Sequence, residues 1–152
     1  MAFRLVNSAG NVRDSAFVNV YASGVVRPNE PVDWVPASTG GGIVIPTVGV
    51  DTTQTTFFGV ALDYAQGASD TLVRVIPFDR SQLWEVDCAN SATTGQIGIL
   101  QYMSASRGIV HNQETNVQTI NRVFLPLAMT GATTGSGKLL GIVMVDFGRH
   151  GT

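Results

Sequence analysis

The chain of 152 residues has a net charge of −2, and only 13% of its residues are charged, about half of the roughly 25% that is usual for globular domains. No basic cluster is present, which argues against nucleic acid as the main partner, because phosphate contacts need concentrated Lys and Arg. The apolar runs are too short to cross a bilayer and no charged segment followed by an apolar one opens the sequence, so we expect neither a membrane span nor Sec export. Low charge is also typical of surfaces that partner proteins cover.

The first 42 residues differ from the rest of the chain. Short strands are predicted at Phe3 to Val6 and at Phe17 to Ala22, separated by a polar turn. The following stretch, VVRPNEPVDWVPASTGGG, is rich in Pro and Gly, and about twenty residues without secondary structure usually form a functional loop or linker. We therefore interpret residues 1–42 as a long extended arm, and we expect its deletion to leave a folded domain.

The arm is too apolar for a solvated linker, so it should lie on a protein surface. That surface is either the chain's own barrel, or a neighbouring subunit or larger lattice. Trp34 is the natural anchor, because large aromatic side chains dominate interface energetics. The candidate residues for contact with a shell or a neighbouring subunit are Phe3, Arg4, Arg13, Phe17, Tyr21, Arg27, Val32, Trp34 and Val35.

Residues 43–152 are predicted to form a β-barrel domain. Three consecutive strands joined by short turns are predicted in FFGVALDY, TLVRVIPF and QLWEVDC, because side chains alternate with a period of two in the first and the third segment. A meander is the simplest topology for them. Leu72 to Phe78 is apolar at nearly every position except Arg74, as expected of a strand that is covered on both sides. Trp84, Val86 and Cys88 share the packed face of the third strand.

The other predicted strands complete an all-β chain. IVIPTVGV reads as an edge strand because of Pro46, and QIGILQYMS as a further strand. RVFLPLAM and LLGIVMVDF form a long hairpin, and the second of these segments is apolar on both faces, which predicts a central or covered position. Seven or eight short strands with polar turns indicate a small antiparallel β-barrel or a β-tulip or sandwich.

No motif in the sequence predicts a reaction. TTGSGKLL departs from the phosphate-binding loop, since Ala132 replaces the first glycine and Leu139 follows the lysine. Cys88 and His111 have no spacing that would place them in a thiol triad, and one cysteine with two histidines lacks the paired spacing of a zinc site. We expect no catalytic residue, no cofactor and no metal, and therefore no enzyme.

The pattern of residues 56–148 resembles the decoration, or cement, proteins on the heads of tailed bacteriophages. The stretches that carry the resemblance are GVALDYAQGASDTLVRVIPFDRSQLWEVDCANSATTGQIG, RVFLPLAM and GSGKLLGIVMVDFG. In that group a strand that begins with Gly and small apolar residues precedes a Val-rich strand, then a strand that ends in an acidic residue, and an apolar strand closes the last hairpin.

The resemblance implies a viral structural protein of the virion. It would sit on the outer capsid surface, bind the major capsid protein and stabilise the shell, commonly as a homo-oligomer with a trimer favoured. Nucleic acid, membrane and cofactors have no part in this function. The alternative is a receptor- or carbohydrate-binding β-module of a phage fibre or spike, which would present exposed Trp or Tyr in a cleft flanked by carboxylates.

Overall fold

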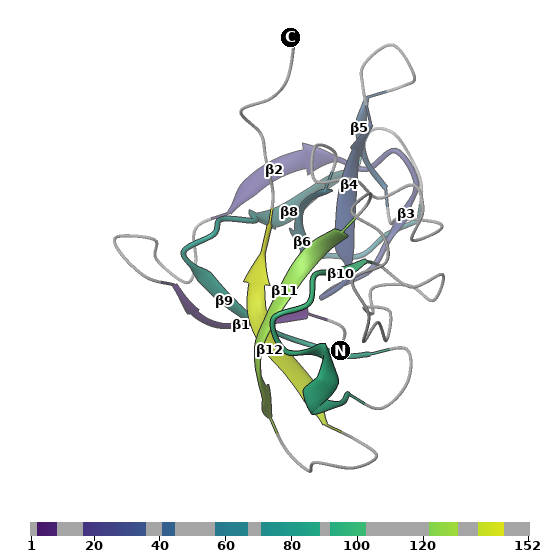
Figure 1. The fold of residues 1–152 in the computed structure, drawn as a ribbon. Helices are drawn as coiled ribbons and strands as arrows, with labels where there is room; N and C mark the ends of the chain where they lie inside the picture. Colours follow the sequence, from purple (N-terminus) through teal and green to yellow (C-terminus); the bar gives the residue numbers. More distant parts are fainter. Residues whose placement is uncertain are drawn as a thin grey trace, which may run out of the picture.

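We describe the protein from a computed structural model, in which residues 3–8, 17–35, 41–44, 57–66, 71–88, 92–102, 122–130 and 137–144 are described. These residues form antiparallel β-sheets and one short 3-10 helix, η2, at Thr94–Gln96 (Figure 1). The all-β prediction is therefore confirmed.

The first sheet contains five strands in the order β1–β9–β12–β11–β10. Their bounds are Phe3–Ser8 for β1, Gln82–Val86 for β9, Lys138–Val143 for β12, Arg122–Thr130 for β11 and Gln101–Tyr102 for β10. The predicted hairpin is present as β11 and β12, with Thr130 paired to Lys138. Its second strand lies between β9 and β11, which confirms the central position that its apolar faces indicated.

The second sheet curls into a half-barrel. Its order is β2–β8–β6–β4–β5, with β2 at Val18–Tyr21, β8 at Leu72–Pro77, β6 at Phe57–Ala61, β4 at Pro31–Val35 and β5 at Gly42–Val44. A parallel bridge between Ala22 and Ile43 brings its two outer strands together, and the Ser23 N–H donates to the Ile43 carbonyl at 2.8 Å. A ladder of β3, Val25–Val26, with β7, Ala65–Gln66, lies beside it.

Two hydrophobic cores hold these sheets. The first, which joins residues of both sheets, is aromatic: the Phe3 ring lies 5.8 Å from Phe78, 6.1 Å from Trp84 and 6.2 Å from Phe124, measured between ring centroids. The second belongs to the half-barrel and its ladder and uses small side chains, which suit a tightly curved sheet. Its buried members are Val20, Ala22, Val26, Val32, Ile43, Ala61, Ala65, Val73 and Val75.

Strand β8, which was predicted to be covered on both sides, contributes to both cores. Val73 and Val75 are buried in the second core, whereas Ile76 belongs to the first. Leu72 and Arg74, at the start of the strand, are exposed. The strand is thus covered on both sides only along its second half.

The predicted meander is wrong at the connection from β8 to β9, because these strands belong to different sheets. The chain turns sharply after Phe78. The Asp79 carboxylate accepts from the Ser81 N–H at 2.7 Å, and the Asp79 carbonyl accepts from the Gln82 N–H at 3.0 Å. This turn places Trp84 against Phe78 across the core, with ring centroids 5.3 Å apart.

The segment from Gln96 to Tyr102 is not a continuous strand. Residues 94–96 form η2, and only Gln101–Tyr102 pair in a sheet. Gly98 has a φ of +78°, a conformation that interrupts a strand and that glycine adopts without steric cost. Gln96 and Gln101 are both buried, and the Gln96 side-chain amide donates to the Gln101 side-chain oxygen at 3.2 Å.

Among the described residues, 3–8 and 17–35 are built into the chain's own sheets and do not form an extended arm. β1 pairs with β9, β2 with β8, and β4 with β6. The prolines fit this arrangement: Pro31 is the first residue of β4, and Asn29, with a φ of 64°, turns the chain just before it. Of the two surfaces on which this segment could lie, the described residues lie on the chain's own barrel.

Candidate protein-contact surface

Large apolar side chains are exposed on the outer face of β2 and β8. Tyr21 pairs directly with Leu72 across the two strands, and each is 54% exposed. Their strand neighbours Val20 and Val73 are also paired, but these two point into the second core. Alternation along the two paired strands therefore gives one face to the core and leaves Tyr21 and Leu72 in water on the other, beside the exposed pair of Asn19 and Arg74.

Arg74 lies in the same row of outward-facing residues and is held by two partners. Its Nη2 is bonded to Asp63 Oδ1, with an N–O distance of 2.6 Å, and its Nε donates to Oδ2 at 2.9 Å. Its guanidinium also lies over the ring of Phe17, 5.6 Å from the centroid, in a cation–π contact. We call Phe17, Tyr21, Leu72, Arg74 and Asp63 the β2–β8 face.

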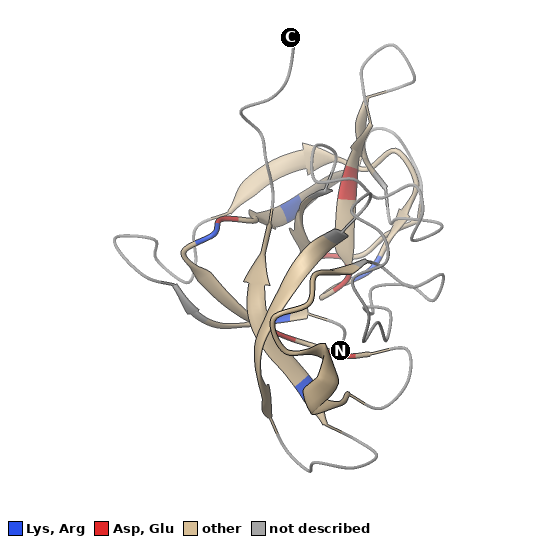
Figure 2. Cartoon of the chain, viewed as in Figure 1, with Lys and Arg blue, Asp and Glu red and all other residues tan. Residues whose placement is uncertain are grey.

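The charges of the β2–β8 face compensate each other. Hydrogen bonds from the side chain and then the backbone N–H of Arg74 hold the pKa of Asp63 below its usual value, and the same carboxylate raises the pKa of Arg74. Both groups are thus ionised at neutral pH. Figure 2 shows that β2 and β8 otherwise carry little charge. The face therefore presents apolar area with one neutralised ion pair, which is typical of protein contacts.

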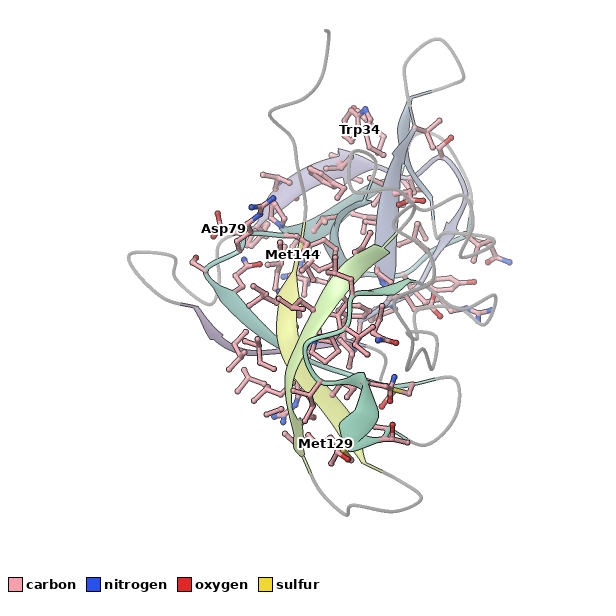
Figure 3. The ribbon with its side chains drawn as sticks, viewed as in Figure 1. Trp34, Asp79, Met129 and Met144 are labelled. Carbon is pink, nitrogen blue, oxygen red and sulfur yellow. The ribbon has the colours of Figure 1, made fainter. Side chains whose placement is uncertain are left out.

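Trp34, on β4, is a further exposed aromatic residue, and Tyr64 is another. The Trp34 side chain is 44% exposed, and its ring meets that of Phe58 in a T-shaped contact with centroids 5.4 Å apart. Figure 3 shows Trp34 projecting at the opposite end of the molecule from Met129. The contact with Phe58, which packs on the second core, orients the indole and leaves part of it accessible.

The predicted contact residues differ in how exposed their side chains are in the structure. Phe17, Tyr21 and Trp34 are exposed as a contact role requires. Phe3 and Val32 are 1% and 0% exposed, so their assignment to a contact surface is wrong, because each side chain is part of a core. Arg4 and Arg27 are exposed, Val35 is half-buried, and Arg13 lies outside the described residues.

Three members of the β2–β8 face were missing from the predicted contact residues: Leu72, Arg74 and Asp63. The sequence does single out Arg74, because it is the one charged residue in an otherwise apolar predicted strand. Leu72 and Asp63 could not be found in the same way, because their position depends on which strands pair and in what register.

Cys88 packs against the first core. Burial raises the pKa of its thiol to about 11, although a hydrogen bond with Gln96 opposes the shift. The thiol is therefore protonated at neutral pH, and a protonated thiol is a poor nucleophile. His111 and His150, the other residues considered for a catalytic or zinc site, lie outside the described residues.

Glu85, on β9, and Asp87, which follows this strand, both form ion pairs within the chain. Arg4 Nη2 lies 3.0 Å from Glu85 Oε1, and Lys138 Nζ lies 3.1 Å from Asp87 Oδ1.

Among the residues that the structure covers, no helix is long and apolar enough to cross a membrane.

Comparison with protein-family models, with curated proteins and with solved structures finds no match to this chain.

Proposed function

We propose that this chain is a structural assembly protein, and specifically a decoration protein that binds the outer surface of a tailed-phage head and stabilises the shell. The observation that carries the proposal is the β2–β8 face, where Tyr21 and Leu72 are each 54% exposed beside a neutralised ion pair. An exposed face of this kind suits contact with another protein. The sequence resemblance supplies the identity of that protein, the major capsid protein.

The area of the β2–β8 face sets the strength of such a contact. Complete burial of a large apolar side chain contributes about 1.5 to 3 kcal/mol, so burying the exposed half of Phe17, Tyr21 and Leu72 would contribute on the order of 3 kcal/mol in total. A single contact of that strength corresponds to a dissociation constant above about 1 mM. The protein would therefore act through many copies on a repeating surface, where effective concentration makes weak sites sufficient. Its binding free energy would add to the stability of the assembled shell.

The alternative, a carbohydrate- or receptor-binding module, would use Trp34. We favour protein docking because the exposed aromatic residues Phe17 and Tyr21 lie on a sheet face and the nearby carboxylate, Asp63, already binds Arg74. Sugar sites instead place an aromatic ring in a cleft with carboxylates that are available to the ligand.

The test is co-sedimentation of the full chain with purified phage heads from the same source. We expect the wild-type protein to pellet with the heads and Leu72→Glu to lose at least about tenfold in occupancy, because the new carboxylate must be desolvated on docking. Gln66→Glu is the matched control, since Gln66 is an exposed strand residue outside the β2–β8 face. Wild-type protein that remains in the supernatant would contradict the proposal, as would full occupancy of the Leu72 variant. Glycan binding that Trp34→Ala abolishes would instead support the alternative.

A further inference from the structure

Arg74 is the polar residue in the middle of the β2–β8 face. It pairs with Asn19 on β2, and alternation along β8 places it on the same side of the sheet as Leu72. The ring of Phe17 lies against its guanidinium, 5.6 Å from the ring centroid to Cζ. The side chain is 50% exposed. A protein that docks on this face therefore meets the guanidinium between exposed apolar side chains.

The ion pair with Asp63 uses only one side of the guanidinium. Nε donates to Asp63 Oδ2 at 2.9 Å, and Nη2 donates to Oδ1 at 2.6 Å, so these two nitrogens form the fork that holds the carboxylate. Arginine carries five N–H donors in a fixed plane. Nη1 and the second N–H of Nη2 form another fork at the tip of the side chain, which points away from Asp63. A second acceptor can bind there without displacing the first.

The guanidinium is already fixed before a partner arrives. Asp63 accepts from the backbone N–H of Arg74 at 2.9 Å as well as from its side chain, and the Arg74 carbonyl accepts from the Leu62 N–H at 2.8 Å. Phe17 covers one face of the guanidinium. Ordering a long side chain is one of the costs that weaken protein contacts, and this cost is smaller for a side chain that the chain itself holds in place. Arginines near the centre of a contact are among the residues that most often dominate its strength.

The charge of Asp63 selects the kind of acceptor that suits the tip of Arg74. A carboxylate of the partner would bind the same guanidinium as Asp63, and two like charges so close together repel in a contact from which water is excluded. A main-chain carbonyl oxygen accepts the same N–H groups and carries no net charge. The second fork therefore favours an uncharged acceptor.

The geometry points to Arg74 as the residue that determines the specificity of the β2–β8 face, by donating from its tip to a main-chain carbonyl oxygen of the partner protein. This inference rests on the proposed function, since the partner is the shell protein on which the face docks. It adds the chemical group that the shell must present and the donor that recognises it.

Co-sedimentation of Arg74→Lys with purified phage heads tests the inference. Lysine keeps the positive charge beside Asp63 but has no second fork, so we expect binding at least about tenfold weaker than that of the wild type. Arg80→Lys is the matched control, because Arg80 is exposed in the turn after β8 and lies outside the β2–β8 face. It should bind like the wild type. Thermal unfolding of Arg74→Lys should stay close to that of the wild type, because exposed ion pairs contribute little to stability.

A salt series identifies the acceptor. The double variant Asp63→Asn with Arg74→Gln has the same net charge as the wild type, so long-range attraction or repulsion by the head affects both proteins equally. The wild type should bind more tightly than the double variant by a factor of at least about ten, and by the same factor at about 50 mM and about 500 mM salt. A factor that falls toward one at high salt would mean that the acceptor is charged, and would overturn the assignment of a carbonyl.

The same experiment separates this inference from the proposed function. Heads that retain Arg74→Lys as fully as the wild type, but lose Leu72→Glu, would overturn the role of Arg74 and leave docking through the β2–β8 face intact. Wild-type protein that stays in the supernatant would overturn both.

Discussion

At the scale of single residues, one buried amide fixes the corner where the chain passes between the sheets. Gln82 is 2% exposed, and its side chain makes three hydrogen bonds to groups of this corner. Its Oε1 accepts from the Asp79 N–H at 2.9 Å and from Trp84 Nε1 at 3.2 Å, and its Nε2 donates to the Pro77 carbonyl at 3.0 Å. The amide therefore satisfies the buried indole N–H of Trp84 and two partly buried backbone groups of the turn.

We predict that Gln82→Leu lowers the free energy of unfolding by about 3 kcal/mol, because each buried polar group left without a partner costs roughly 1 to 3 kcal/mol. The variant keeps a similar side-chain volume, so the loss reports on hydrogen bonds and not on packing. Gln66→Leu, at an exposed position of β7, should change stability by less than about 0.5 kcal/mol. Urea unfolding of the three proteins measures both effects, and equal stability of the Gln82 variant and wild type would show that water satisfies this corner.

At the scale of elements, the first sheet depends on a close approach of β11 and β12. Gly141 of β12 pairs with Pro126 of β11 and, on the other side, with Trp84. A Cβ atom at position 141 would collide with the carbonyl oxygen of Leu125 and with the ring of Phe124. Glycine is required here for space and not for an unusual backbone angle.

Gly141→Ala should accordingly lower stability by about 2 kcal/mol, in the range of roughly 1 to 3 kcal/mol that overpacking costs. Gly98→Ala offers a comparison in which the loss of stability comes from the backbone angle and not from lack of space. Gly98 has a φ of +78° but open space around the missing Cβ, so its substitution should cost only about 1 kcal/mol of backbone strain. Thermal or urea unfolding ranks the two variants. A Gly141 variant that is more stable than the Gly98 variant would mean that the hairpin adjusts to the extra methyl group.

The elements also show what the sequence could and could not predict. Alternation with a period of two located β9, and nearly continuous apolar runs located β8 and β12, because burial of one or both faces imposes these patterns on the residues themselves. Alternation carries no information on which strands pair, so the change of sheet between β8 and β9 was missed. The β2–β8 face was predicted only in part for the same reason: Tyr21 could be recognised by its residue type, whereas Leu72 becomes part of the surface only through its pairing with Tyr21.

At the scale of the whole molecule, the N-terminal residues belong to both cores. Phe3 lies at the centre of the aromatic cluster of the first core, within 6.2 Å of three other rings measured between centroids. Val20, Ala22, Val26 and Val32 supply four of the buried residues of the second core. A segment with these contacts cannot be separated from the domain that follows it, because both cores would lose part of their buried surface.

Deletion of residues 1–42 should therefore abolish folding, in contrast to the independent barrel that the sequence suggested. The deletion removes β1 to β4, exposes the edges of β8, β9 and β6, and leaves the first core without its central ring. Phe3→Ala in the full chain removes only the central ring of the first core and serves as the milder comparison. We expect it to lower the free energy of unfolding by about 3 to 5 kcal/mol while unfolding stays cooperative. Circular dichroism and thermal unfolding measure the folding of the truncated chain and of the Phe3→Ala variant. A truncated chain that melts cooperatively with the β-sheet spectrum of the full protein would mean that residues 43–152 form a domain of their own, and the first 42 residues would then again be an arm.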